Sequence, residues 1–122
     1  MRRRKAEGNG TSIEAAPPPI VSTLEVGPEV VGLITEFVTG LPERAAALER
    51  SLASDDLDGV ADLAHRLKGS AAGYGFPSIM SAAANLEASA RSGAAIWQVA
   101  GCVQAVVALC RRARAPREAP GS

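Results

Sequence analysis

The chain has 122 residues, of which 47% are hydrophobic but only 3% are aromatic, and its formal net charge is zero. A core made almost entirely of Ala, Val, Leu and Ile favours closely packed helices over a sheet, and this length is typical of one domain. No uninterrupted apolar run of about 18 residues occurs, so we expect a soluble protein with no membrane-spanning helix.

The charges are unevenly distributed along the chain. Residues 20–110 carry ten acidic and five basic side chains, whereas residues 1–19 and 111–122 carry four basic side chains each. Basic tails raise the question of nucleic-acid binding, but an acidic body with a single tyrosine offers neither a stacking surface nor a continuous basic face. We therefore expect no nucleic-acid partner, and we interpret the arginines after Cys110 as cations that favour the negative end of the last helix.

Residues 1–19 are expected to form a disordered, basic and proline-rich arm. They are polar, contain glycine and end in the three prolines Pro17–Pro19, which favour an extended conformation. The basic residues Arg2–Lys5 resemble the start of a secretory signal, but the polar segment Ala6–Thr11 stands where an apolar region would be needed. We therefore expect a cytoplasmic protein with no membrane partner.

The folded domain is expected to cover residues 20–114, followed by a disordered tail at 115–122. It could begin with a short extra helix or a turn at Ser22–Val26, before a proline opens the first long element. The rest of the domain contains four segments in which apolar residues recur every three or four positions. This is the pattern of amphipathic helices that face a bundle.

The first of these segments runs from Pro28 to about Ala53. Gly40 and Pro42 interrupt it, so it forms either one kinked helix or two shorter ones. The other three segments begin after caps or turns at Ser54–Asp56, Gly73–Phe76 and Ser92–Gly93. Four amphipathic helices joined by short turns predict an all-α fold, an antiparallel up-down-up-down four-helix bundle.

A single bundle with one apolar seam is expected to be a monomer. If the helical stripes are assigned one residue off, however, Trp97, Val107 and Phe76 would form an exposed apolar patch. Cys102 and Cys110 lie about 12 Å apart along one helix, which is too far for a disulfide bond. We interpret both cysteines as small buried hydrophobic residues.

The only histidine of the chain, His65, lies in the second helical segment at the edge of its apolar stripe. Because positions three and four apart share a helix face, Lys68 and Gly69 lie one turn beyond it. A neutral imidazole is a competent nucleophile, a lysine ammonium can neutralise phosphoryl oxygens, and a glycine leaves room for a docking partner. These are the requirements of a phosphoryl acceptor.

Two plainer interpretations of this histidine must be weighed. Without further pattern, a single histidine beside an apolar stripe is more simply a packing or surface residue. A metal site is disfavoured, because only Asp62, one turn before His65, is near ligand spacing, and we expect that carboxylate to be solvated. The chain also lacks a Gly-x-x-x-x-Gly-Lys phosphate loop, so we expect no ATP site of its own and no kinase activity.

The run His65-x-Leu67-Lys68-Gly69-Ser70-Ala71 resembles the signature of the histidine-containing phosphotransfer (HPt) domains of multistep phosphorelays. The resemblance continues through Gly75 and through Leu86-Glu87-x-x-Ala90-Arg91, and it extends from about Val21 to Arg114. It implies a four-helix bundle that acts as a phosphorelay intermediate in two-component signalling.

The resemblance also implies how the site works. His65 would accept a phosphoryl group, through Nε2, from an aspartate of one receiver domain and pass it to another; the receivers would belong to response regulators or a hybrid histidine kinase. Lys68 would balance phosphate charge, Gly69 would admit the partner's backbone, and Glu87 would hold the other ring nitrogen. No cofactor is expected on this chain, and Mg²⁺ is expected on the receiver.

Residues around the histidine are expected to face the partner, and these are Ala61, Asp62, Arg66, Ser70 and Ala72. A plainer interpretation of Glu87 is a solvated surface acid paired with Arg91 four residues later. Two rival functions also stay open at this point. One is a non-catalytic helical adaptor that binds receiver or kinase partners without phosphate, and the other is a bundle that binds a metal or another cofactor through His65.

Overall fold

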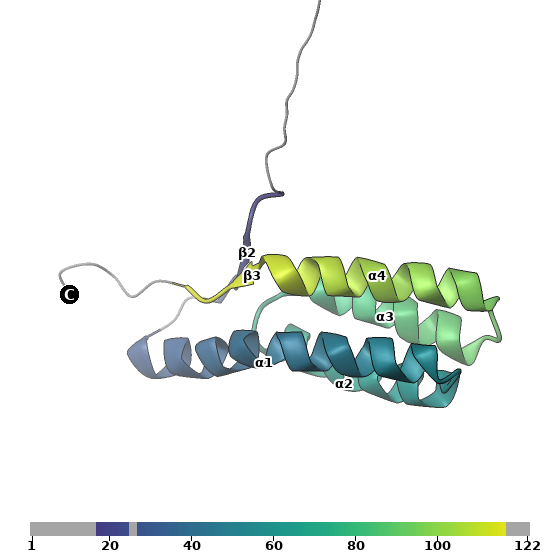
Figure 1. Cartoon of the computed structure of the whole chain (residues 1–122). Helices are drawn as coiled ribbons and strands as arrows, with labels where there is room; N and C mark the ends of the chain where they lie inside the picture. Colours follow the sequence, from purple (N-terminus) through teal and green to yellow (C-terminus); the bar gives the residue numbers. More distant parts are fainter. Residues whose placement is uncertain (1–16, 25–26, 117–122) are drawn as a thin grey trace, which may run out of the picture.

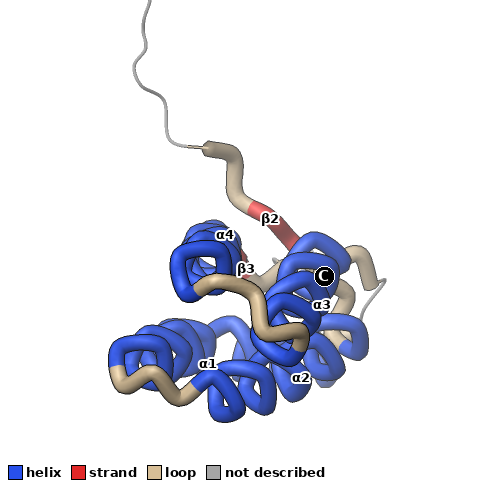
Figure 2. Tube along the Cα trace, turned by 90° about the vertical axis from the view of Figure 1, so that its right-hand side faces the viewer, coloured by secondary structure: helices blue, strands red, loops and turns tan. Residues whose placement is uncertain are grey.

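The computed structural model describes residues 17–24 and 27–116 of the chain. Its elements are β2 (Ile20–Val21), α1 (Pro28–Ala53), α2 (Leu57–Gly73), α3 (Pro77–Arg91), α4 (Ile96–Arg112) and β3 (Ala113–Arg114). Successive helices run in alternating directions (Figure 1), and in the end view the four helices surround one core (Figure 2). The predicted all-α four-helix bundle is confirmed.

Helix α1 is one continuous element that includes Pro42. A proline inside a helix cannot donate the usual backbone hydrogen bond, which disfavours the helix locally. Buried residues on both sides, Phe37 and Leu41 before the proline and Ala45 and Leu48 after it, fix the two halves against the same core. Of the two alternatives for residues 28–53, the structure therefore shows a single helix.

Helix α2, which carries the histidine, begins at a side-chain cap. The Asp56 carboxylate accepts a hydrogen bond of 2.9 Å from the backbone N–H of Gly59, and Asp58 lies in the first turn near the positive end of the helix dipole. The predicted cap at Ser54–Asp56 is thus confirmed.

Helix α3, which follows α2, begins with Pro77 in its first turn. The missing N–H of proline costs nothing there, because the first N–H groups of a helix have no partner within the helix.

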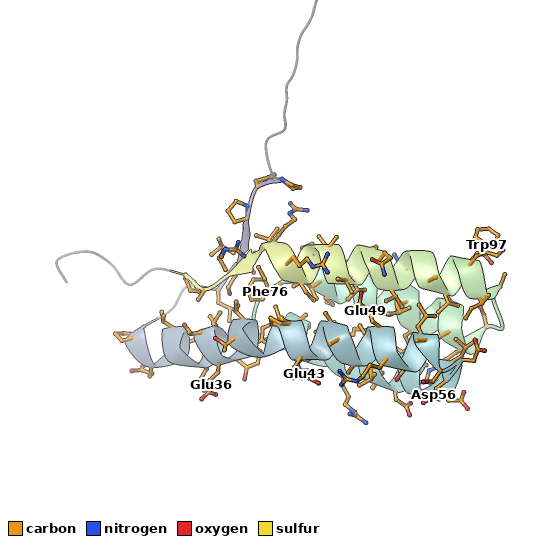
Figure 3. All side chains as sticks on the ribbon, in the orientation of Figure 1. Glu36, Glu43, Glu49, Asp56, Phe76 and Trp97 are labelled. Atoms are coloured by element: carbon orange, nitrogen blue, oxygen red, sulfur yellow. The ribbon has the colours of Figure 1, made fainter. Side chains whose placement is uncertain are left out.

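The core is entirely hydrophobic among the described residues, with no buried polar or charged side chain. Phe37 stacks on Tyr74 at 5.0 Å between ring centroids, and Phe76 lies 5.7 Å from Phe37, so the three rings close one end of the bundle. Phe76 and Val107 are buried, whereas Trp97 is exposed at the start of α4 (Figure 3). The three residues therefore do not form an apolar surface patch. The apolar stripe that the sequence predicts for α4 is buried at Val99, Val103, Val106 and Cys110, but Ile96, which was also assigned to it, is exposed.

The two cysteines both lie on α4 and have free thiols. Cys110 is buried, as predicted, and Cys102 is half-buried. Burial raises the pKa of the Cys110 thiol to about 11, which keeps it protonated and unreactive near neutral pH.

A segment before α1, residues 17–24, crosses the end of the bundle as a strap. Its strand β2 pairs in parallel with β3, with Ile20 opposite Ala113 and Val21 opposite Arg114. Figure 1 shows this pairing at the end of the bundle where α4 finishes. The strap thereby joins two parts of the chain that are far apart in sequence.

The sequence predicted a short helix or a turn at Ser22–Val26. The described part of that segment, Ser22–Leu24, forms no helix, and the last two residues lie outside the described ranges. The Ser22 hydroxyl instead donates to the Tyr74 carbonyl at 2.6 Å, and the Thr23 backbone N–H donates to the Gly75 carbonyl at 2.8 Å. These bonds to the α2–α3 turn compete with local helix formation. Of the arm expected at 1–19 and the tail expected at 115–122, residues 1–16 and 117–122 lie outside the described residues, while residues 17–19 belong to the strap.

No helix within residues 17–24 and 27–116 reaches the length and hydropathy that a bilayer crossing requires.

We predict that Gly75→Ala destabilises the protein more than Gly93→Ala does. Both glycines have a positive φ, +83° and +77°, so each alanine should cost about 1 kcal/mol of backbone strain. A Cβ at Gly75 would also lie 2.6 Å from Ser22 Oγ and 2.9 Å from Leu24 Cγ, whereas a Cβ at Gly93 would meet nothing within 4 Å. Urea unfolding should show the difference, and equal losses would mean that the strap does not pack on this turn.

Candidate functional site

The imidazole of His65 lies on the outer surface of α2. Its neighbours Ala64 and Leu67 are buried in the core, which fixes the rotation of the helix, and the His65 side chain itself remains 62% exposed. The ring is therefore accessible from outside, as a phosphoryl acceptor requires.

A carboxylate on the adjoining helix holds the ring. Glu87 of α3 is only 14% exposed, and its Oε2 lies 3.1 Å from His65 Nδ1. The same carboxylate accepts a 2.8 Å hydrogen bond from Lys68 Nζ at Oε1 and a 3.1 Å hydrogen bond from Arg91 Nε at Oε2. One carboxylate thus connects the histidine, the lysine and an arginine.

A second acid completes the cluster from the α2 side. Arg91 Nη2 lies 3.4 Å from Asp62 Oδ1, so the guanidinium bridges Glu87 on its own helix and Asp62 on α2. Both Asp62 and Arg91 are about half or more exposed, so this outer pair contributes little stability by itself. Its effect is to hold Arg91 beside Glu87.

Hydrogen bonding from Lys68 is the main cause that lowers the pKa of Glu87 from 4.5 to about 2; partial burial opposes this shift, and the Arg91 hydrogen bond adds to it. Arg91 in turn has a raised pKa, chiefly because it donates to Glu87. Glu87 is therefore fully ionised near neutral pH.

An ionised carboxylate can only accept hydrogen bonds, so the ring nitrogen that faces Glu87 must carry the proton. In a neutral His65 this places the proton on Nδ1 and leaves the lone pair on Nε2. The site therefore presents an exposed ring with a defined tautomer and a lysine one turn away. Such a group can act as a nucleophile toward an electrophile that a partner brings.

The residues predicted to surround the histidine are mostly where the sequence suggested. Ser70 is half-buried, as is Lys68, and the exposed members are Asp62, Arg66, Gly69 and Ala72. Ala61 is a correction: only 1% of it is exposed, because it belongs to the buried stripe of α2, so its side chain cannot contact a partner.

The sequence interpretation did not assign Arg91 to the site. Its spacing of four residues from Glu87 was visible, but that spacing alone is also typical of an ordinary surface pair. The contact with Asp62, 29 residues away, appears only once α2 and α3 are packed together.

In the part of the chain that the structure describes, no group of three or more His, Cys, Asp or Glu side chains could hold a metal ion.

The fold and the site together define a class of protein: a helical bundle that presents one oriented histidine on its surface. A family model for the Hpt domain matches residues 32–115, well over half of the chain. The chain belongs to the Hpt domain family, and its role is phosphotransfer in two-component signalling. No significant match is found among curated proteins or among solved structures.

We predict that Lys68→Ala raises the pKa of Glu87 from about 2 toward 4.5, because the hydrogen bond from Lys68 is the largest cause of the lowered pKa in the wild type. Carboxyl ¹³C NMR titration would measure this. Arg91→Ala should raise the pKa of Glu87 by less, and a larger rise in that variant would contradict the assignment.

The lowered pKa also fixes a pH dependence of stability. In the wild-type protein, the stabilisation from the Glu87 ion pairs is complete above about pH 4.5 and is lost as the pH falls toward 2.

Proposed function

We propose that this protein is a phosphorelay intermediate that accepts a phosphoryl group on Nε2 of His65 from an aspartyl phosphate of one receiver domain and passes it to another receiver. The observation that carries the proposal is the contact between Nδ1 and the ionised Glu87 on an otherwise exposed ring. It leaves the reactive nitrogen unprotonated and pointing away from the carboxylate that holds the ring.

The transfer needs no proton to be removed at the nucleophile. As the Nε2–P bond forms, the bond between phosphorus and the receiver's aspartate oxygen breaks, and the electron pair of that bond leaves with the aspartate. The proton already on Nδ1 stays there, so the ring becomes a phosphorylated imidazolium. Glu87, 3.1 Å from Nδ1, then stabilises the positive charge that develops on the ring.

Lys68 is placed to respond to the incoming phosphate. In the resting state its ammonium bonds to Glu87 at 2.8 Å, and its side chain is 35% exposed. A flexible lysine one turn from His65 can turn toward phosphoryl oxygens, while Arg91 continues to hold Glu87. Mg²⁺ and the aspartate belong, in this proposal, to the receiver, and this chain contributes positioning and charge.

The surface around the ring fits a protein partner better than a small substrate. A Cβ built at Gly69 would meet nothing within 4 Å, so the fold itself does not require glycine there. We assign its use to the partner, whose backbone would pass over this position. A groove of about 310 Å³ lies between α1 and α2, the helix that carries His65. Its lining combines apolar side chains with the charged residues Glu43, Arg44 and Arg66, so it offers a partner both kinds of contact.

We predict that His65→Gln abolishes phosphoryl acceptance while the far-UV circular dichroism spectrum stays helical, because the ring is exposed and supports no core contact. Incubation with a phosphorylated receiver domain should give an acid-labile, base-stable label on the wild type only. Glu36→Gln, on an exposed part of α1 whose side chain points away from the bundle (Figure 3), is the matched control and should be labelled normally. Full labelling of His65→Gln would end the proposal.

We also predict that Glu87→Ala slows the transfer about 10-fold or more, as loss of a group that orients a reactive histidine commonly does. Ring ¹⁵N chemical shifts should show the proton on Nδ1 in the wild type and a shift of population toward the Nε2-protonated form in the variant. A slower transfer with unchanged tautomer populations would show that Glu87 does not act by orienting the ring.

A further inference from the structure

The strap meets the end of α4 at one end of the bundle (Figure 1). A second cavity lies there. It has a volume of about 540 Å³. Its lining comes from both segments and consists of Pro17, Pro19, Ala108, Arg111, Arg112 and Arg114. None of these residues belongs to the His65 site.

Two of the three arginines are held in place by backbone carbonyls. Arg112 Nε donates to the Pro18 carbonyl at 2.8 Å, and Arg114 Nη1 donates to the carbonyls of Arg111 and Ala113 at 2.9 Å each. These bonds fix the positions of the two guanidinium groups before any ligand arrives. A guanidinium has five N–H donors, so most donors of both groups remain available.

Among the described residues, no acidic side chain pairs directly with the positive charge at this cavity. Across residues 17–24 and 27–116, no carboxylate lies within 4.0 Å of the side chain of Arg111, Arg112 or Arg114. The negative end of the α4 dipole is equivalent to only about half an elementary charge. Three guanidinium groups therefore supply far more positive charge than the helix end can balance.

The remaining lining suits an organic molecule. Proline rings, Ala108 and the aliphatic stems of the arginines form a mainly apolar wall, and the cavity volume falls in the usual range of small-molecule sites. Guanidinium groups bind phosphate oxygens through paired, charge-assisted hydrogen bonds. The cavity thus combines an apolar surface with cations that fit phosphate.

We propose that this cavity binds a small organic phosphate with at least two negative charges, held by Arg111, Arg112 and Arg114. The ligand would contact the strap and α4 at once, so its binding stabilises the pairing of β2 with β3. This site is independent of the phosphoryl transfer proposed for His65.

Inorganic pyrophosphate is the first probe, because it presents the phosphate chemistry alone. Titration calorimetry should show saturable binding, and ¹H–¹⁵N spectra should shift at residues 18–21 and 111–114. Arg111→Gln should weaken the binding about 10-fold. The side chain of Arg111 makes no hydrogen bond or ion pair within the described residues, so its loss leaves the strap contacts of Arg112 and Arg114 intact.

Arg50→Gln on α1 is the matched control, because it removes the same charge from an exposed arginine on another element. An equal effect of both substitutions would show general charge attraction and overturn the proposal, as would the absence of saturable binding to every phosphate probe. Phosphatidylcholine vesicles that contain phosphatidic acid test a lipid headgroup as the source of the phosphate. Arg111-dependent binding to those vesicles would support the proposal with a lipid ligand, whereas stronger binding of oligoglutamate than of pyrophosphate would overturn it.

Discussion

The close packing of α2 against α3 is the constraint on which the site depends. These two helices contact each other more extensively than any other pair in the bundle. Alanines occupy about half of the buried positions of these two helices, namely Ala61, Ala64 and Ala71 on α2 and Ala83 and Ala90 on α3. Small side chains let helix axes approach closely, and only then can Glu87 reach the ring of His65 from the adjoining helix.

The same packing explains why a mostly buried carboxylate is kept charged. Partial burial alone would raise the pKa of Glu87, but the hydrogen bonds from Lys68 and Arg91 lower it to about 2. An ionised carboxylate with two cationic partners is a permanent acceptor for Nδ1. Besides the stabilisation that its ion pairs supply, the cluster therefore holds one proton on one ring nitrogen.

Much of the fold could be predicted from the sequence because it depends on local pattern. The spacing of apolar residues predicted four helices, and it placed His65 one position past the buried Ala64, where the structure finds it exposed. The run around His65 also indicated Lys68 as its neighbour. These inferences rest on helical periodicity or on a contiguous motif, whereas the role of Glu87 as support of the ring was implied only by the resemblance to HPt domains.

What the sequence could not predict depends on contacts between distant segments. A short helix or turn was expected at Ser22–Val26, and no strand was expected before it. Strand β2 nevertheless pairs with β3, more than ninety positions later, and nothing in Ile20–Val21 alone indicates that partner. The bridge from Arg91 to Asp62 likewise needs the register between α2 and α3. Ala61 was assigned to the surface because small residues on a helix fit both a docking face and a tight core, and composition cannot separate the two.

A relay intermediate must release its phosphoryl group as readily as it takes it, and the geometry suits that requirement under the proposed function. Glu87 accepts the hydrogen bond of Nδ1 whether the ring is free or phosphorylated, and this contact becomes stronger when the phosphorylated ring is cationic. Lys68 also has an anionic partner in both states, the carboxylate of Glu87 before transfer and the phosphoryl oxygens after it. Because both groups keep a partner at either end of the reaction, neither state leaves the Glu87 carboxylate or the Lys68 ammonium unpaired, and under the proposed function the receivers would set the direction of transfer.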